Sequence, residues 1–451
     1  MVDNDNITKD GQDETPEPVP FWSPHLRGVR AQVVRKLALM ILFLCVFIVG
    51  VLSLYWAILF REEKNLPALK VWVVDFDGQI EPYHSSGSRP LVGPVIISVA
   101  TQIIQNITGT LGFTIKPPAD FGNDPFAVRQ SIYDERAYAA IIVNANATTL
   151  LRQAIVQGNT SYDPFGAAQV ITISARDQTT YPIYISTPLF EFQITALTAF
   201  GQQWASELAA NSSLDFSRVP QAVNPGIGFT NIDLRPFTPP VATPAVTIGL
   251  IYLIVIAFFS FPFMMPIHSI YINQRYPLRI SHMIVWRILS TVVAYFFLSL
   301  CYSIVSLAYR IPLSNHPAPD TESASNPNAY GKGSFVVFWM LNWVGMAALG
   351  FPSENMGMIL GSPWNALWLI FWIITNVATG FYSLDLAPGF FAWGYVWPLH
   401  RIVEGSRTIL FDTHSRIGLD FGVLFGWAGV SVALFPFAAM FMRWKKKKGM
   451  S

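Results

Sequence analysis

Hydrophobic residues along the chain are gathered into long runs that are separated by polar stretches. The first run covers residues 37–59, and its 23 residues exceed the roughly 20 that an α-helix needs to cross the hydrocarbon core of a bilayer. A cleaved signal peptide would be shorter and nearer the start, so we predict a permanent membrane anchor. Further runs predict five more helices, at residues 246–266, 284–309, 335–351, 363–383 and 421–442. The pattern is typical of a polytopic α-helical membrane protein with six transmembrane helices.

Basic residues flank these runs on one side of the predicted membrane. Residues 1–36 form a polar tail that we predict to be disordered, and its basic residues come directly before the first span. They are Arg27, Arg30, Arg35 and Lys36. A second basic tail follows the last span at residues 443–451, where it is expected to contact anionic lipid. Because cytoplasmic flanks are enriched in Lys and Arg, we predict that both termini are cytoplasmic.

Residues 61–242 connect the first and second spans and then lie on the outer side of the membrane. This segment is long enough for one independent core, and short apolar stretches alternate in it with helical patterns. Strands are predicted at 69–76, 137–144 and 169–175, and helices at 91–109, 148–157 and 189–210. The alternation predicts an extracytoplasmic α/β domain. The proline-rich residues 216–245 are predicted to be an extended return to the membrane.

Acceptor sites for N-glycosylation favour the same orientation. Of five Asn-x-Ser/Thr patterns in the chain, four fall in the predicted outer domain and none in a later loop. These four are Asn106, Asn146, Asn159 and Asn211. Their clustering predicts a glycosylated domain on the outer side of the membrane, which is followed by the five spans at 246–442.

The segment at residues 385–420 is apolar and aromatic but cannot form one continuous helix. Pro388, Gly389, Gly394 and Pro398 interrupt it. A seventh full span here would place the basic C-terminal tail outside, against the charge rule. We therefore predict a re-entrant segment on the outer face, packed against protein because broken backbone in a membrane needs hydrogen-bond partners.

Composition excludes several classes of protein. Hydrophobic residues make up 52% of the chain and charged residues only 13%, about half the share of a soluble protein. The net charge of +1 indicates no nucleic-acid partner, and two cysteines exclude a disulfide framework. The sequence contains no P-loop, HExxH or GxSxG pattern. We expect no enzyme activity, no cofactor and no metal site.

Arg287 is the one formal charge within the six predicted spans. It is expected to extend to the cytoplasmic headgroups, with contact to an anionic lipid or cargo as the alternative. Glu354, in a short turn predicted after the fourth span, is interpreted as a helix cap or, alternatively, as a cargo contact.

His400, Arg401 and Glu404 follow the interrupted segment. On a helix, His400 and Glu404 would share one face and could pair, since they are four residues apart. We interpret the three as a polar strip that anchors the re-entrant segment. The alternative is a polar lip on an exit path for a lipid or drug.

Small residues recur at the start of the last predicted span. Gly418, Gly422 and Gly426 are spaced four apart, a pattern that lets two helices approach closely. The pattern indicates a packing face, either within the monomer or between two copies in a homodimer.

Several segments carry a resemblance to known families. They are residues 71–78 (VWVVDFDG), 90–94 (PLVGP), 138–144 and 398–405 (PLHRIVEG), together with the basic stretch and anchor. In its order of spans and outer domain the chain resembles the permease subunits of type-2 ABC exporters, and it more closely resembles the fungal nitrosoguanidine-resistance protein family. The resemblance implies an integral membrane protein, expected at the plasma membrane, that contributes to tolerance of toxic compounds.

Three functional hypotheses follow. The first is a permease that exports a hydrophobic toxin or lipid, which needs a separate ATPase docked on the cytoplasmic loop at residues 267–283. The second is a non-transporting regulator of lipid distribution in the bilayer or of another, lipid-translocating protein. The third, a receptor or adhesion protein, ranks last because five spans after the domain exceed what an anchor requires.

Overall fold

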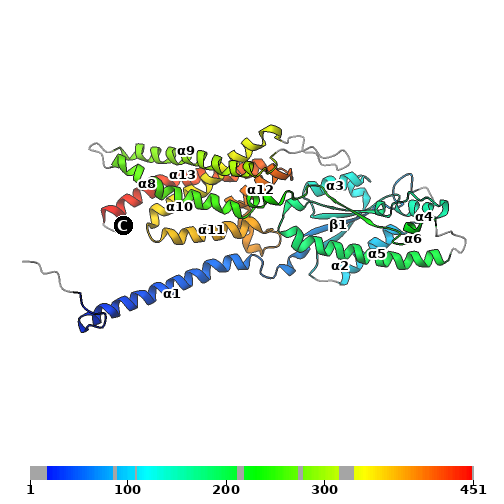
Figure 1. Cartoon of the computed structure of the whole chain (residues 1–451), viewed down its shortest axis with the longest axis horizontal. Coiled ribbons are helices and arrows are strands. Elements are labelled where there is room, and N and C mark those ends of the chain that lie inside the picture. The colour runs from blue at the N-terminus through cyan, green and yellow to red at the C-terminus, as the bar shows by residue number, and fades with distance from the viewer. Residues whose placement is uncertain are drawn as a thin grey trace, which may run out of the picture. The chain divides into compact units, whose positions relative to one another are not determined.

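The computed structural model describes residues 18–84, 89–106, 109–210, 218–272, 278–313 and 330–448. It divides into two compact units, Met1–Ser53 and Leu54–Ser451. Most of the first unit's described part is helix α1 (Arg27–Ala57), shown in blue in Figure 1. The helix begins ahead of residue 37, so the prediction of a disordered tail is wrong for residues 27–36. Their basic residues favour helix and simply extend the apolar run; residues 1–17 lie outside the described part.

The second unit contains a helical domain that follows the α/β domain. Its main helices are α8 (Ile251–Ile272), α9 (Ile280–Ala308), α10 (Ser334–Leu360), α11 (Asn365–Phe381), α12 (Pro398–Phe411) and α13 (Ile417–Lys447). Among the described residues, the helices long and apolar enough to cross a membrane are five, those that contain α1, α8, α9, α10 and α13. α11 has 17 residues and rises only about 26 Å, so a sixth span stays a prediction.

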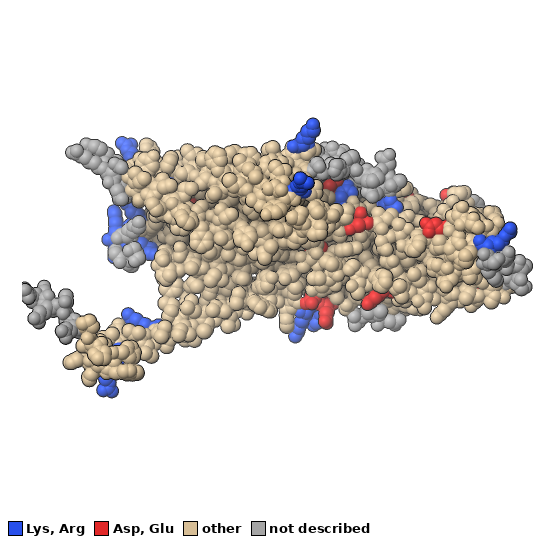
Figure 2. Space-filling model, viewed as in Figure 1, with Lys and Arg blue, Asp and Glu red and all other residues tan. Residues whose placement is uncertain are grey.

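Charged atoms are scarce on the visible surface along the middle of this helical domain. On the face seen in Figure 2, the described surface of these helices is almost entirely tan between blue atoms near its two ends. Basic residues close the far end, where α13 continues to Lys447, so the predicted basic tail is largely helical. The uncharged band is what a lipid-facing surface requires.

Helix α10 is longer than the sequence pattern predicts. The predicted span ended at residue 351 because Pro352 and Glu354 suggested a turn, but the helix continues through both to Leu360. Proline is tolerated in membrane helices where neighbouring groups replace the lost backbone hydrogen bond. In the next position, the Ser353 hydroxyl donates to the carbonyl of Leu349 at 3.0 Å, and the Trp372 side chain donates to the same carbonyl at 3.1 Å. Glu354 is therefore inside a helix, and its interpretation as a cap is wrong.

The α/β domain is built on one five-stranded sheet in the order β2-β1-β3-β4-β5. Its strands are β1 (Lys70–Asp75), β2 (Gly112–Lys116), β3 (Ala139–Val143), β4 (Ala168–Thr172) and β5 (Phe229–Asp233). β1 is parallel to both neighbours, β4 is antiparallel to β3, and β5 is parallel to β4. The two edge strands were not predicted, and β5 replaces part of the expected extended return.

Side chains of the central strands alternate between two apolar layers. Ile141 of β3 packs on one side of the sheet with α2 (Val92–Asn106), α4 (Ala147–Gln157) and α5 (Ser186–Ala209). Ile142 packs on the other side with α3 (Pro125–Tyr133). Successive residues of a strand point to opposite faces, so helices cover both sides of the sheet (Figure 1). The predicted α/β fold is observed; its location outside the cytoplasm stays a prediction.

The predicted glycosylation sites lie at or beyond helix ends. Asn106 ends α2, Asn146 caps the start of α4, and Asn159 is exposed beyond the end of α4. Asn211 lies outside the described residues. Glycosylation of these residues stays a prediction.

Asp77 joins the end of β1 to the starts of two helices. Its carboxylate accepts the N–H of Gly93 at 3.1 Å and the N–H of Thr148 at 3.0 Å, and it also accepts the Thr148 hydroxyl proton. The Thr148 oxygen in turn accepts the N–H of Leu91 at 2.8 Å. A carboxylate at helix starts satisfies backbone donors that have no partner within the helix.

Asp75 lies beside Asp77 and is also buried. Burial, and to a lesser extent the charge of Asp77, raise the pKa of the Asp75 carboxyl to about 6. The N–H of Asp77 and the amide of Gln79 donate to it and oppose the shift. The folded protein therefore holds a proton on Asp75 at a pH where the unfolded chain has released it.

This proton makes the stability of the α/β domain depend on pH. Because the folded pKa is above the unfolded value of 3.8, the free energy of unfolding should fall as pH rises from about 4 to about 6, by roughly 3 kcal/mol. Asp75→Asn cannot ionise and should lose this slope. Hydrogen exchange of the β1 and β3 amides in the full-length protein, corrected for intrinsic rates, measures it. Exposed Asp120→Asn is the control, and an unchanged slope in Asp75→Asn would contradict the assignment.

Candidate functional site

Helix α12 contacts both the apolar helices α10, α11 and α13 and the α/β domain. Pro398 occupies its first turn, where a missing N–H costs nothing, and separates it from the 3₁₀ helix Gly389–Val396. The helix packs against α10, α11 and α13, and also against the turn Ser174–Arg176 that follows β4. The predicted break in residues 385–420 is thus observed, and the segment after it is buried on nearly all sides.

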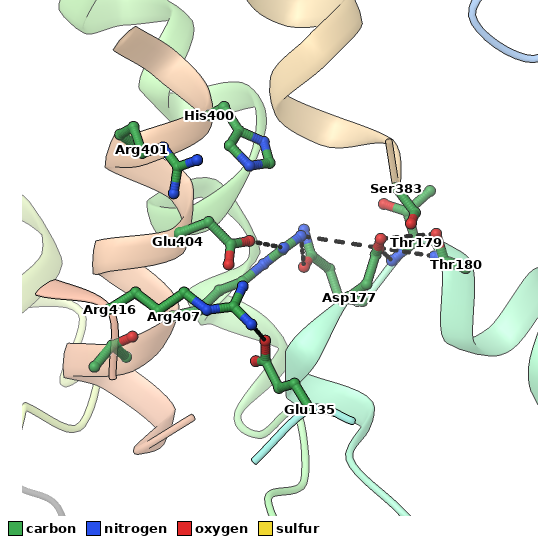
Figure 3. A network of polar contacts seen from close by, with 12 residues as sticks. Glu135, Asp177, Thr179, Thr180, Ser383, His400, Arg401, Glu404, Arg407 and Arg416 are labelled. Atoms are coloured by element: carbon green, nitrogen blue, oxygen red, sulfur yellow. Dashed lines mark hydrogen bonds and ion pairs between the residues drawn. The ribbon is translucent and has the colours of Figure 1, made fainter. Parts of the chain in front are cut away.

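Arg407 is the central residue of this junction (Figure 3). Its guanidinium donates to Glu404 at 3.0 Å and to the Gln178 side chain at 2.9 Å, and it lies 3.8 Å from Asp177. Asp177 is held in place by Thr180, whose N–H and hydroxyl both donate to it. One arginine of the helical domain is therefore shared between its own helix and a loop of the α/β domain.

Two more ion pairs cross the same junction. Arg416 lies 3.2 Å from Glu135, and Arg235 lies 2.9 Å from Asp412. Both carboxylates are on residues with a left-handed backbone, with φ of 60° for Glu135 and 55° for Asp412. Glycine is preferred in this conformation because other residues are strained there by about 1–2 kcal/mol. In both residues this backbone accompanies a side chain that pairs across the junction.

A tyrosine supplies a third kind of contact. The Tyr138 hydroxyl, from the α/β domain, donates to Asp385 at 2.7 Å and lies 2.9 Å from the hydroxyl of Ser383. The guanidinium of Arg176 lies over the Tyr138 ring, 3.7 Å from its centre. Asp385 also accepts a hydrogen bond from Tyr395 at 3.1 Å. The loop after α11 is thereby attached to the sheet.

These groups surround a polar cavity of about 80 Å³. Its charged lining comprises Arg176, Arg401, Arg407 and Arg416 with Glu135, Asp177, Asp385 and Glu404, so positive and negative charges are equal in number. A volume of this size holds a few water molecules and is well below the several hundred Å³ of a typical ligand pocket. The cavity is therefore too small for a drug-sized compound.

Electrostatic effects within the junction depend on its own charges. Burial raises the pKa of the Glu135 carboxyl, and the nearby Glu404 raises it further, while Arg176 and Arg416 oppose the shift. Burial acts in the same direction on Glu404, but Arg407, His400 and Arg416 outweigh it and lower its pKa. Glu404 is therefore the firmly ionised member, and Glu135 is the one that a fall in pH neutralises first.

The predicted trio on this helix is brought together only in part. Glu404 pairs with Arg407, three residues on, in place of the expected pairing with His400. The His400 ring contacts the carbonyl of Thr379 at 3.1 Å, and Arg401 lies 3.4 Å from Asp420 on α13. Arg407 lies in the predicted segment and its spacing from Glu404 was a usable signal. Its partners in the α/β domain gave none, because they are more than 200 residues away in sequence.

A second charged site lies inside the helix bundle. Arg287 of α9 pairs with Glu354 of α10, and their side chains are only 4% and 2% exposed. Thr291 donates to the same carboxylate at 3.3 Å. The rings of Phe261 and Phe435, from α8 and α13, lie 5.4 and 5.1 Å from the guanidinium. Arg287 therefore does not extend to the headgroups as expected, because a carboxylate within the bundle neutralises it.

The predicted glycine face on α13 has no neighbour among the described residues. A Cβ atom built on Gly418, Gly422 or Gly426 would meet nothing within 4 Å. Packing within the monomer is therefore not the role of this face in the described structure. A contact between two copies stays a prediction.

Comparison with known proteins assigns a family. Residues 40–433 match the family described as "Protein of unknown function (DUF3533)", and the chain belongs to that family. The chain is also 25% identical over 457 aligned positions to an uncharacterized endoplasmic reticulum membrane protein of Saccharomyces cerevisiae. The alignment covers 95% of this chain and 84% of the yeast protein. No solved structure matches. The protein is an integral membrane protein, and neither the family description nor the name of this yeast relative states a function.

Removing Arg407 should weaken the contact between the helical domain and the α/β domain and so destabilise the protein. Arg407→Met leaves Glu404 and Asp177 buried without their cation, which costs about 3–5 kcal/mol. Arg152→Gln breaks a partly exposed pair with Glu207 within the α/β domain and should cost about 1 kcal/mol or less. Thermal unfolding of the full-length protein in detergent measures both. Equal losses in the two variants would show that the junction does not depend on Arg407.

The pair inside the bundle should behave as one unit. Arg287→Met or Glu354→Leu alone leaves one buried charge and should destabilise the protein by about 3–5 kcal/mol. The double variant removes both charges and should recover most of that loss. Melting temperatures of the four proteins form a double-mutant cycle. Additive losses would mean that the two residues do not depend on one another.

Proposed function

We propose that this member of the DUF3533 family is a permease-like protein that exports, or gives resistance to, toxic hydrophobic compounds such as nitrosoguanidine. The observation that carries the proposal is the position of α12. This helix packs on the apolar helices α10, α11 and α13 and is joined to the α/β domain by ion pairs of Arg407 and its neighbours. Such a connection lets a movement in one domain change the packing of the other.

A simple anchor does not need this arrangement. A single apolar helix holds a domain at a membrane, whereas the described residues of this chain form five helices of spanning length, with a buried ion pair between two of them. Ionisable residues within membrane helices are costly and are typical of functional positions. The bundle therefore supports a role in the membrane itself rather than a receptor role for the α/β domain alone.

The proposal includes a location and a partner. Both termini lie in the cytoplasm of a cell whose plasma membrane holds the protein, and the α/β domain lies outside with glycans on its acceptor asparagines. Because the sequence has no P-loop, a separate ATPase docks on the loop around residues 267–283. The open face at Gly418, Gly422 and Gly426 joins two copies into a dimer.

A second function is favoured by one specific observation. In the described bundle, the Glu354 carboxylate is bound by Arg287 and by the Thr291 hydroxyl, so it is not free to bind a cargo. This supports a non-transporting regulator of lipid distribution in the membrane, or of another transporter.

Accumulation of a radiolabelled nitrosoguanidine distinguishes the two functions. Cells with the gene should lose the compound faster than cells without it, and depletion of ATP should abolish the difference if an ATPase drives export. Arg407→Gln should reduce loss of the compound, whereas Lys116→Gln, on the exposed edge of the sheet, should not. Variant amounts at the membrane are matched first. Equal accumulation with a growth advantage from the gene would contradict export and favour the regulator.

A further inference from the structure

An apolar groove lies where α8 begins and α9 ends. It has a volume of about 670 Å³ and is lined from the α8 side by residues such as Tyr252 and Ile256. On α9 its lining recurs every three or four residues, as in Leu298, Tyr302 and Val305, so one face of that helix forms the other wall. The volume is within the range of about 300–1,000 Å³ found for small-molecule sites.

The groove results from a break in the chain before α8. Thr243–Val246 and Ile248–Leu250 are short helices separated by Thr247, whose φ of −139° and ψ of −121° are not helical. Gly249 permits the tight fold between them, because a Cβ there would lie 2.3 Å from the Pro244 carbonyl oxygen. Ala245 and Ser306 are buried at the floor of the groove, and such small side chains leave space beneath its walls.

Both helices that border the groove are long and apolar enough to cross a membrane. Hydrocarbon contains no water to fill such a space, so its occupant must itself be apolar. The groove lies at the end of the bundle where the chain arrives from the α/β domain. In the proposed orientation this is the outer half of the bilayer.

A positive charge marks the rim. Arg310 is exposed between Tyr309 and Ile311, both of which line the groove. It occupies the position after α9 with a φ of 56°, while the N–H of Ile311 donates to the carbonyl of Ser306 at 3.2 Å. Glycine is the usual residue at this position of a helix end. Within the described residues Arg310 makes no ion pair, and the two residues on either side of it line the groove.

We propose that this groove binds a membrane phospholipid with an anionic headgroup, its acyl chain along α9 and its phosphate at Arg310. The apolar walls match the chain, and the cationic rim matches the headgroup. For its role in the cell this inference rests on the proposed function, and it adds a lipid site to the membrane part of the protein.

Photolabelling of the full-length protein in nanodiscs tests the acyl-chain part. The probe is a phosphatidic acid with a diazirine in one acyl chain, and the products are mapped by mass spectrometry. Label should concentrate on residues 298–311 and be competed by unlabelled phosphatidic acid. Val305→Trp fills the groove and should abolish this label. Val293→Trp is the matched control, because Val293 is 47% exposed against 55% for Val305 but does not line the groove.

The headgroup part is tested at Arg310. Arg310→Gly removes the charge while suiting the left-handed backbone, so folding is kept, and it should lower labelling by phosphatidic acid about fivefold. Arg310→Lys should retain it. A matching phosphatidylcholine probe should label the groove less and be indifferent to the charge. Arg279→Gln, at the other end of α9, should change nothing.

Two results would overturn the inference. One is label spread evenly over the surface of α8 and α9 and unaffected by Val305→Trp. The other is equal labelling by the two lipids in the wild-type protein. Competed label in the groove from a protein that exports nothing would support the site while contradicting the export proposal, so the two can fail separately.

Discussion

A charge that is buried away from water is unfavourable unless an opposite charge neutralises it, and this constraint determines how the described second unit is assembled. Arg287 and Glu354 neutralise each other inside the helix bundle. At the junction, Arg407 neutralises groups from its own helix and from the α/β domain at once. Removing one partner of such a pair leaves an unpaired charge buried, which costs more free energy than the intact pair contributes. Each charge therefore requires its own partner. The pairs therefore fix which surfaces meet, while apolar packing supplies most of the favourable free energy.

Sequence patterns predict those parts of the fold that depend on neighbouring residues. Long apolar runs identify the helices of the bundle, and β1, β3 and β4 follow from buried runs of β-branched residues. The edge strands β2 and β5 are half-exposed and carry Lys116 and Asp233, so their composition differs little from that of a loop. The continuation of α10 through Pro352 depends on neighbouring helices, which no local pattern describes.

In the candidate site, too, sequence patterns identify the residues, while tertiary structure determines their partners. His400, Arg401 and Glu404 are recognisable from sequence because they interrupt an apolar segment. Their roles are not recognisable from sequence. Glu404 has two candidate partners at helical spacing, His400 and Arg407, and in the structure Arg407 pairs both with Glu404 and with Asp177 of the α/β domain. Arg287 likewise lacks any local sign of its carboxylate, because the proline before Glu354 suggested a turn. Local spacing restricts the possible partners, and tertiary structure selects among them.

The junction and the groove have one feature in common, which is a charged residue with a left-handed backbone. Glu135, Asp412 and Arg310 all have φ between 55° and 60°, where glycine would cost less. The side chains of the first two form ion pairs across the junction. Arg310 is under the same strain beside an apolar groove, without an ion pair among the described residues. The positive charge of Arg310 is complementary to the anionic headgroups of a membrane surface, which is the contact that the proposed lipid site assigns to it.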